Sequence, residues 1–272
     1  MQHESKPLAQ TNIPEDTRSV SSAAGSVLIL IGYGLAIAAA ELIVAHLHMV
    51  TGTVLHALLL FTLLCHYGMA RHAAYRSILV PLALLPLLRI LSLTMALKDI
   101  PPLYWYILVG SPLLLGILYA INVLDWQRTA LSWGRLSWWK EPLVALSGLP
   151  LGYAAYMLAQ PEPLIANATG PELALVALML VVFVALPEEI LFRGLLLRAS
   201  SERLGPYAIL YSSLLFAVTY IGTLDWQVVL FMGLVGLVFG TCVCKTNALW
   251  GVIAAHSVLV IELLVLLPVM LA

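Results

Sequence analysis

Charged residues are scarce in this sequence. Asp, Glu, Lys and Arg together make up 10% of the 272 residues, whereas a water-soluble domain carries about 25%. So few charges cannot cover a globule that faces water, and the composition therefore excludes an ordinary soluble domain. The formal net charge is -1, which offers no general attraction to nucleic acid, so no nucleic-acid partner is expected.

Cysteine is scarce as well, with Cys65, Cys242 and Cys244 in or beside apolar segments. Cys242 and Cys244 are too close for an easy disulfide, and no second pair completes a zinc site, so free thiols are expected. No cofactor and no metal are expected. Residues 1–22 are polar and lack a short apolar segment with a cleavage site, so no removable signal peptide is expected.

Long hydrophobic runs dominate the rest, since 62% of the residues are hydrophobic. They predict an all-α fold, a polytopic transmembrane helix bundle of about nine spans in contact with the lipid bilayer. A polar tail is expected at 1–24, a transmembrane region without an assigned role at 25–171, and a second membrane domain at 172–268. The expected spans are 25–47, 53–70, 77–97, 103–124, 141–159, 172–195, 207–222, 226–244 and 247–268.

The distribution of Lys and Arg predicts the orientation. If the chain changes sides with each span, eleven of the 13 Lys and Arg residues fall on one side, Lys98 falls opposite and Arg89 falls inside a span. Cytoplasmic loops carry the excess of basic residues, so the N-terminus is expected in the cytoplasm and the C-terminus outside. The stretch 126–140 holds four tryptophans among basic residues and is expected at the membrane interface.

Ionisable residues inside a membrane are costly, and each is a candidate for function. Glu41 and Arg89 are expected to form a structural ion pair between the first and third spans. The candidates are Glu41, Arg89, Glu188, Glu189, Arg193, His256 and Glu262.

The adjacent carboxylates of Glu188 and Glu189 end a long apolar run. Adjacent residues on a helix point about 100° apart, so the two acids should have different partners. Arg193 lies one helical turn after Glu189 and can pair with it. Glu188 can then face a polar cavity, where a carboxylate suits general base catalysis. Spacing alone leaves a solvated acid pair at a helix end equally open.

An ordered set of motifs follows along the chain, and together the motifs resemble the CPBP intramembrane proteases. This family includes type II CAAX prenyl endopeptidases and bacterial Abi proteins. The resemblance covers about residues 172–265. The motifs are Glu188-Glu189-x-x-x-Arg193 with Gly194-Leu195-Leu196-Leu197-Arg198, then 212–217, then Gly233-x-x-Gly236-x-x-x-Gly240, and then 246–251 leading to Ala255-His256.

The resemblance implies the catalytic residues of an intramembrane peptidase. In the family, the first glutamate and a histidine in a Phe-x-x-x-His motif activate a water, while a second histidine and an Asn or Asp four residues later stabilise the oxyanion. Glu188 matches the first glutamate, and His256 matches the second histidine. Glu189 and Arg193 match the supporting pair. The implied substrate is a membrane protein or a lipidated peptide, and a bacterial or archaeal inner membrane is the expected location.

Two positions depart from the family pattern. Tyr220 stands where the family has a histidine, and a tyrosine does not exchange a proton near neutral pH as imidazole does. As a candidate catalytic residue, Tyr220 is instead expected to position the water or the substrate. Val260 stands where the family has Asn or Asp, and valine donates no hydrogen bond. Tyr220 also lies fourteen residues past Pro206, roughly 21 Å along a helix, whereas Glu188 and His256 are expected nearer the cytoplasmic ends of their spans.

These departures keep a second function open, a catalytically weak or inactive relative that binds a membrane substrate or partner. A transporter or channel is less favoured, because the sequence has no repeated half and no matching pair of interrupted helices. A metalloenzyme with Glu188 and His256 as ligands lacks the third strong ligand that such sites use.

Overall fold

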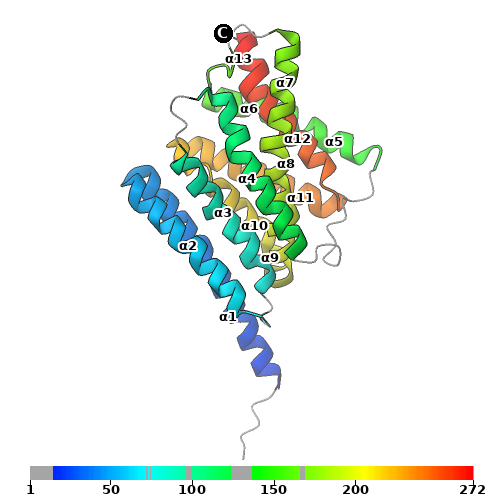
Figure 1. Cartoon of the computed structure of the whole chain (residues 1–272). Helices are drawn as coiled ribbons and strands as arrows, with labels where there is room; N and C mark the ends of the chain where they lie inside the picture. Colours follow the sequence, from blue (N-terminus) through cyan, green and yellow to red (C-terminus); the bar gives the residue numbers. More distant parts are fainter. Residues whose placement is uncertain are drawn as a thin grey trace, which may run out of the picture.

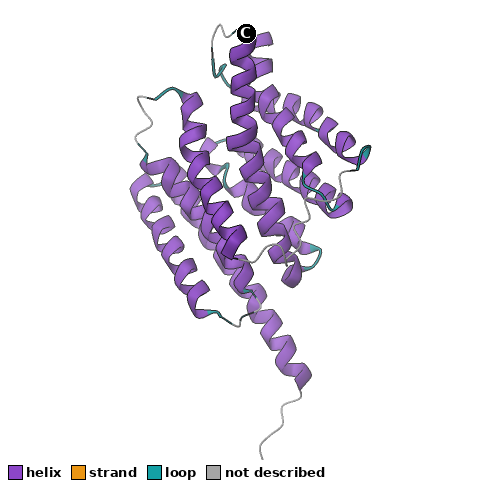
Figure 2. Ribbon diagram, turned by 45° about the vertical axis from the view of Figure 1, so that its right-hand side comes forward, coloured by secondary structure: helices purple, strands orange, loops and turns teal. Residues whose placement is uncertain are grey.

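A computed structural model describes residues 15–71, 73, 75–95, 100–123, 137–165 and 169–271, with the side chains of α1 described from residue 24 onward. These residues form helices joined by short loops and contain no strand (Figure 2). The predicted all-α membrane bundle is therefore confirmed.

The N-terminal half contains four long helices. They are α1 (Glu15–His46), α2 (Met49–Met69), α3 (Arg76–Thr94) and α4 (Pro102–Val123). α1 and α2 form an antiparallel pair along one edge of the bundle, and α3 packs against both α2 and α4 (Figure 1). The helix α1 begins ten residues earlier than the expected span, so part of the predicted polar tail is helical, and residues 1–14 lie outside the described residues.

The C-terminal half is built around one long helical segment, Gly170–Leu204. The short helices α5 and α6 precede it, and α10 to α13 follow it. The elements are α5 (Lys140–Leu146), α6 (Gly148–Ala159), α7 (Gly170–Leu180), η1 (Val181–Ala185), α8 (Leu186–Glu189), η2 (Ile190–Leu196), α9 (Leu197–Leu204), α10 (Tyr207–Val218), η3 (Ile221–Thr223), α11 (Trp226–Thr246), α12 (Trp250–Ile261), η4 (Glu262–Leu266) and α13 (Leu267–Leu271).

Eight of the nine predicted spans overlap a long apolar helix. Among the described residues, eight helices are long and apolar enough to cross a membrane. The expected span 207–222 corresponds to α10 and η3. α10 has 12 residues and therefore rises about 18 Å, short of a full crossing.

The predicted end of the span that carries Glu188 was wrong, and this changes the depth at which Glu188 lies. The expected span 172–195 continues as helix to Leu204. Arg193 does not end the span, because its side chain is 2% exposed and pairs with Glu189 inside the protein. Glu188 therefore lies near the middle of the helical segment rather than near its cytoplasmic end.

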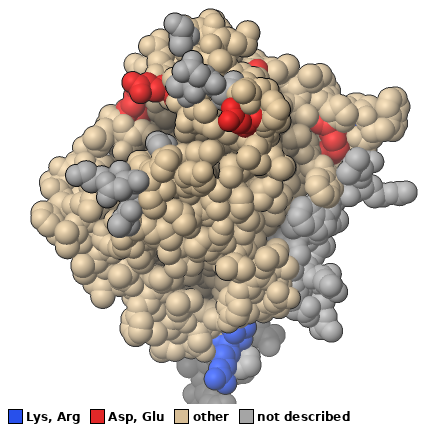
Figure 3. Space-filling view, turned by 45° about the horizontal axis from the view of Figure 1, so that its top comes forward, with Lys and Arg blue, Asp and Glu red and all other residues tan. Residues whose placement is uncertain are grey.

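The predicted orientation leads to a topology experiment. α1 begins at the lower end of the bundle and the chain ends at the upper end (Figure 1). Figure 3 looks onto that upper end, where carboxylates lie, whereas the Lys and Arg side chains visible in this view lie at its lower edge. We expect a reporter fused to the C-terminus to lie outside the cell, and one inserted within 125–140 to lie in the cytoplasm. Reporters that place both chain ends on the same side would contradict the predicted map of nine spans.

Candidate active site

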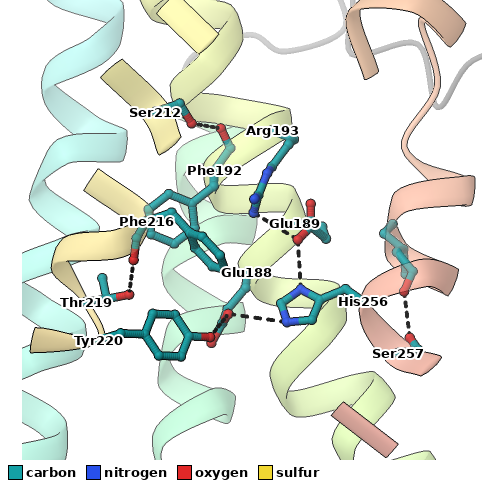
Figure 4. A network of polar contacts seen from close by, with 11 residues as sticks. Glu188, Glu189, Phe192, Arg193, Ser212, Phe216, Thr219, Tyr220, His256 and Ser257 are labelled. Carbon is teal, nitrogen blue, oxygen red and sulfur yellow. Dashed lines mark hydrogen bonds and ion pairs between the residues drawn. The ribbon is translucent and has the colours of Figure 1, made fainter. Parts of the chain in front are cut away.

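The side chains of Tyr220 and His256 meet at the carboxylate of Glu188. The Tyr220 hydroxyl donates to Glu188 Oε2 at 3.4 Å, and Nε2 of His256 lies 3.8 Å from the same oxygen. The side chains of these residues point toward one another in Figure 4. Separations this short allow one water or one substrate oxygen to contact all of these groups.

A second set of contacts lies behind Glu188 and is buried. Arg193 Nη1 donates to Glu189 Oε1 at 2.9 Å, and His256 Nδ1 donates to the same oxygen at 2.8 Å. Glu189 and His256 are fully buried. The pairing of Glu189 with Arg193 across one turn is the arrangement expected from their spacing, and the bond to Glu189 fixes the orientation of the His256 ring.

Aromatic rings enclose the buried charges. The Arg193 guanidinium carbon lies 4.3 Å from the centroid of the Phe216 ring and 5.6 Å from that of Phe239. The His256 ring contacts the same two rings at centroid distances of 6.1 and 6.0 Å. These faces and edges exclude water and stabilise a buried cation through the ring quadrupole.

The long helix and the turn that follows it bring Glu188 and Tyr220 to the same depth. Gly205 has φ 52°, a left-handed conformation that glycine adopts easily, and Pro206 follows it, so the chain reverses direction there. Glu188 lies roughly 24 Å before Leu204 along the helix, and Tyr220 lies roughly 20 Å after Tyr207. The depth mismatch expected from the sequence arose from ending the long helix too early.

The C-terminal part of the chain resembles a known protein family. Residues 170–261 match the family model of the Rce1-like type II CAAX prenyl endopeptidases. The match confirms the resemblance to the type II CAAX endopeptidases. The Rce1-like segment contains Glu188, Glu189, Arg193, Tyr220 and His256. No curated protein and no solved structure matches the chain.

The family match and the helices together define the class of the protein. The chain is an integral, multi-pass membrane protein. The Rce1-like family suggests intramembrane CAAX endopeptidase activity on a membrane-associated substrate. The matched segment begins at residue 170, so α1 to α6 lie outside it.

A cavity of about 680 Å³ opens beside Glu188 between α3, α4 and the Rce1-like segment. Most of its wall is apolar, with Ser92, Trp105 and Tyr106 as polar or amphipathic members. The Glu188 side chain is 22% exposed, whereas that of Glu189 is fully buried. Of the two adjacent carboxylates, Glu188 is therefore the one that a substrate can reach.

Tyr220 and Val260, the two residues that depart from the family pattern, differ in whether their side chains contact the site. Tyr220 reaches Glu188, as described above. Val260 is buried one turn after His256, and its side chain offers no donor. Glu262 packs against Gly152 of α6, so it lies on a different face of its helix from His256.

One residue that positions the site was missed by sequence reasoning. Glu141 is buried in α5, and its Oε2 accepts a hydrogen bond from the backbone N–H of Gly251 at 2.6 Å. It thereby caps the first turn of α12, where the N-cap residue Leu249 makes no side-chain bond. The cap fixes the start of the helix that carries His256. No local signal reveals this role, because the partners are 110 residues apart.

The predicted pair of Glu41 and Arg89 is present outside the Rce1-like segment. Arg89 Nε lies 2.8 Å from Glu41 Oε2, and His56 Nε2 lies 3.4 Å from Glu41 Oε1. The part of the chain that the structure describes contains no group of three or more His, Cys, Asp and Glu residues that could hold a metal ion.

Proposed function

We propose that this protein is an intramembrane endopeptidase that hydrolyses a peptide bond of a membrane-associated protein or lipidated peptide. One observation carries the proposal: the accessible carboxylate of Glu188 lies at the wall of a cavity within 4 Å of both the Tyr220 hydroxyl and His256 Nε2. A base beside two potential hydrogen-bond donors in a water-poor pocket suits attack of water on a carbonyl.

The mechanism begins with proton transfer. Glu188 takes a proton from a water molecule, and the oxygen of that water forms a bond to the peptide carbonyl carbon. The carbonyl oxygen gains negative charge and accepts a hydrogen bond from His256 Nε2. The C–N bond then breaks, and Glu188 returns the proton to the leaving amine, so the carboxylate is regenerated.

The surrounding charges support a protonated His256 in this step. Because a carboxylate only accepts hydrogen bonds, the bond to Glu189 requires a proton on His256 Nδ1. A further proton on Nε2 supplies the donor for the oxyanion. With that proton the cluster of Glu188, Glu189, Arg193 and His256 is neutral, which reduces the cost of burying it in a membrane.

A second candidate function is a relative that binds a membrane substrate and cleaves it weakly or not at all. The observation that favours it is the pair of departures at Tyr220 and Val260, because one removes an imidazole and the other a hydrogen-bond donor. Loss of one oxyanion donor typically costs about 100- to 1000-fold in rate.

Reconstitution separates the two functions. The purified protein is placed in liposomes of bacterial lipids with a farnesylated peptide that ends in a CAAX sequence, and the released C-terminal tripeptide is quantified. We expect the wild type to cleave the peptide, and we expect Tyr220→His to cleave it at least as fast, because an imidazole can share a proton there. No cleavage by the wild type together with cleavage by Tyr220→His would contradict the proposal and favour the binder.

A further inference from the structure

The N-terminal helices contain an ionic cluster that the proposed mechanism does not use. Glu41 of α1, His56 of α2 and Arg89 of α3 meet inside the protein, with Glu41 and His56 buried. We define these residues as the N-terminal ion cluster. Charges at membrane depth are expensive, and apolar residues could join the same helices at lower cost. The position of the cluster relative to Tyr220 indicates a role.

The guanidinium of Arg89 lies directly against the turn that follows Tyr220. A methyl group added at Gly222 would lie 2.6 Å from Arg89 Nη2 and 3.4 Å from both Cζ and Nη1. Gly222 is the middle residue of η3, and a side chain at this position would displace the guanidinium from its present place. Arg89 Nε also forms an ion pair with Glu41 Oε2 at 2.8 Å, which restrains the guanidinium beside Gly222.

Hydrogen bonds within the turn link the position of Gly222 to that of Tyr220. The Thr223 N–H and hydroxyl both donate to the Tyr220 carbonyl oxygen, at 3.0 and 2.8 Å. The Tyr220 N–H donates to the Ala217 carbonyl oxygen at 3.0 Å. The backbone of Tyr220 therefore moves with Gly222, and the Tyr220 hydroxyl is the group that contacts Glu188.

Helix α1 also covers this turn with apolar contacts. Ala45, one turn after Glu41, packs with Tyr220 against the small cluster of Ala217, Ile221 and Val229. The next residue, His46, stacks on Trp226 at the start of α11, with ring centroids 6.1 Å apart and planes 9° apart. The end of α1 thus holds both sides of η3.

We propose that Arg89, paired with Glu41, is a positioning residue that holds the turn carrying Tyr220 and thereby sets the distance from the Tyr220 hydroxyl to Glu188. The inference rests on the proposed function and gives the helices outside the Rce1-like segment a part in catalysis. A displacement of about 1 Å in such a contact can cost about 100-fold in rate.

The test is a double-mutant cycle in proteoliposomes with the farnesylated peptide. Arg89→Gln and Gly222→Ala are each expected to lower kcat about 10- to 100-fold with little change in KM. In the Tyr220→Phe background, neither substitution is expected to lower kcat further, because the hydroxyl that they displace is already absent. Gly222→Ala leaves the ion cluster chemically intact and serves where Arg89→Gln fails to fold.

Tyr211→Phe is the matched control, because the Tyr211 hydroxyl also joins α10 to α1, through the Leu30 carbonyl oxygen at 2.8 Å. It is expected to lower the melting temperature without changing kcat. Additive losses in the cycle would overturn the inference, as would a rise in KM with unchanged kcat, or a loss in Arg89→Gln without any loss in Tyr220→Phe.

A readout independent of activity separates this inference from the proposed function. With 3-fluorotyrosine at position 220, the ¹⁹F resonance is expected to shift in Arg89→Gln and Gly222→Ala and to stay in place in Tyr211→Phe. If the wild type cleaves no peptide, the proposed function fails and the ¹⁹F shifts still decide the positioning role. An unchanged resonance in all variants would overturn it.

Discussion

Replacing Glu188 by glutamine is expected to lower kcat for cleavage of a lipidated peptide by about 100- to 10,000-fold, the range that a general base contributes. Glutamine keeps the size of the side chain and can still accept the hydrogen bond from Tyr220, but it takes no proton from water. The measurement is steady-state cleavage in proteoliposomes, with the melting temperature of each variant determined in parallel.

Glu262→Gln is the matched control for this substitution. Glu262 also lies in a membrane-spanning helix with its Oε2 buried and without a hydrogen-bond partner among the described residues, but it contacts Gly152 instead of the site. Its substitution is expected to leave kcat near the wild-type value. Cleavage by Glu188→Gln at the wild-type rate would contradict the base role, and so would equal losses in both variants.

The substitution Arg193→Met is expected to lower the free energy of unfolding by about 3–5 kcal/mol, because it removes the guanidinium paired with Glu189 and leaves the buried cluster with an excess negative charge. Glu189→Gln is expected to cost a similar amount, because it leaves Arg193 buried without an anion. The double variant removes both charges together, so most of the lost free energy should return. Reversible denaturation in detergent micelles measures these differences.

Activity is expected to follow a different pattern from stability in these variants. The double variant should remain inactive although it is stable, because His256 Nδ1 loses the charged acceptor at 2.8 Å. Arg198→Met is a control at the end of the same helix, where Arg198 bonds Asn247 at 3.3 Å, and it should cost about 0.5–1.5 kcal/mol. Losses of stability that simply add in the double variant would contradict the coupling of Glu189 with Arg193.

Hydropathy predicted most helices well but misjudged the one that matters most. The expected span 25–47 corresponds to Ala24–His46, and the expected span 226–244 to Trp226–Thr246. The long segment Gly170–Leu204 was cut at residue 195, because Arg193 reads as a charge at the membrane surface. A local sum of hydropathy does not detect that a charge is neutralised by a neighbour and enclosed by rings from other helices.

The order of motifs predicted which residues form the candidate site, but not how they meet. Glu189 and Arg193 are one turn apart on the same helix, so their spacing predicted their contact. The contacts of Glu188 with Tyr220 and His256 join three helices, and their lengths depend on where the long helix ends and how tightly the chain turns at Gly205. Spacing along the sequence does not determine either quantity.

The amino-acid sequence by itself determined that the chain is an α-helical membrane protein, where most spans lie, and which ionisable residues belong to an Rce1-like segment. These properties follow from local composition, helical periodicity and ordered motifs. Only the tertiary structure decided that Glu188 and Tyr220 lie at one depth, that Glu141 caps α12, and that Arg89 contacts Gly222. Each of these features involves residues far apart in the chain. It therefore depends on helix packing, which no local sequence pattern records.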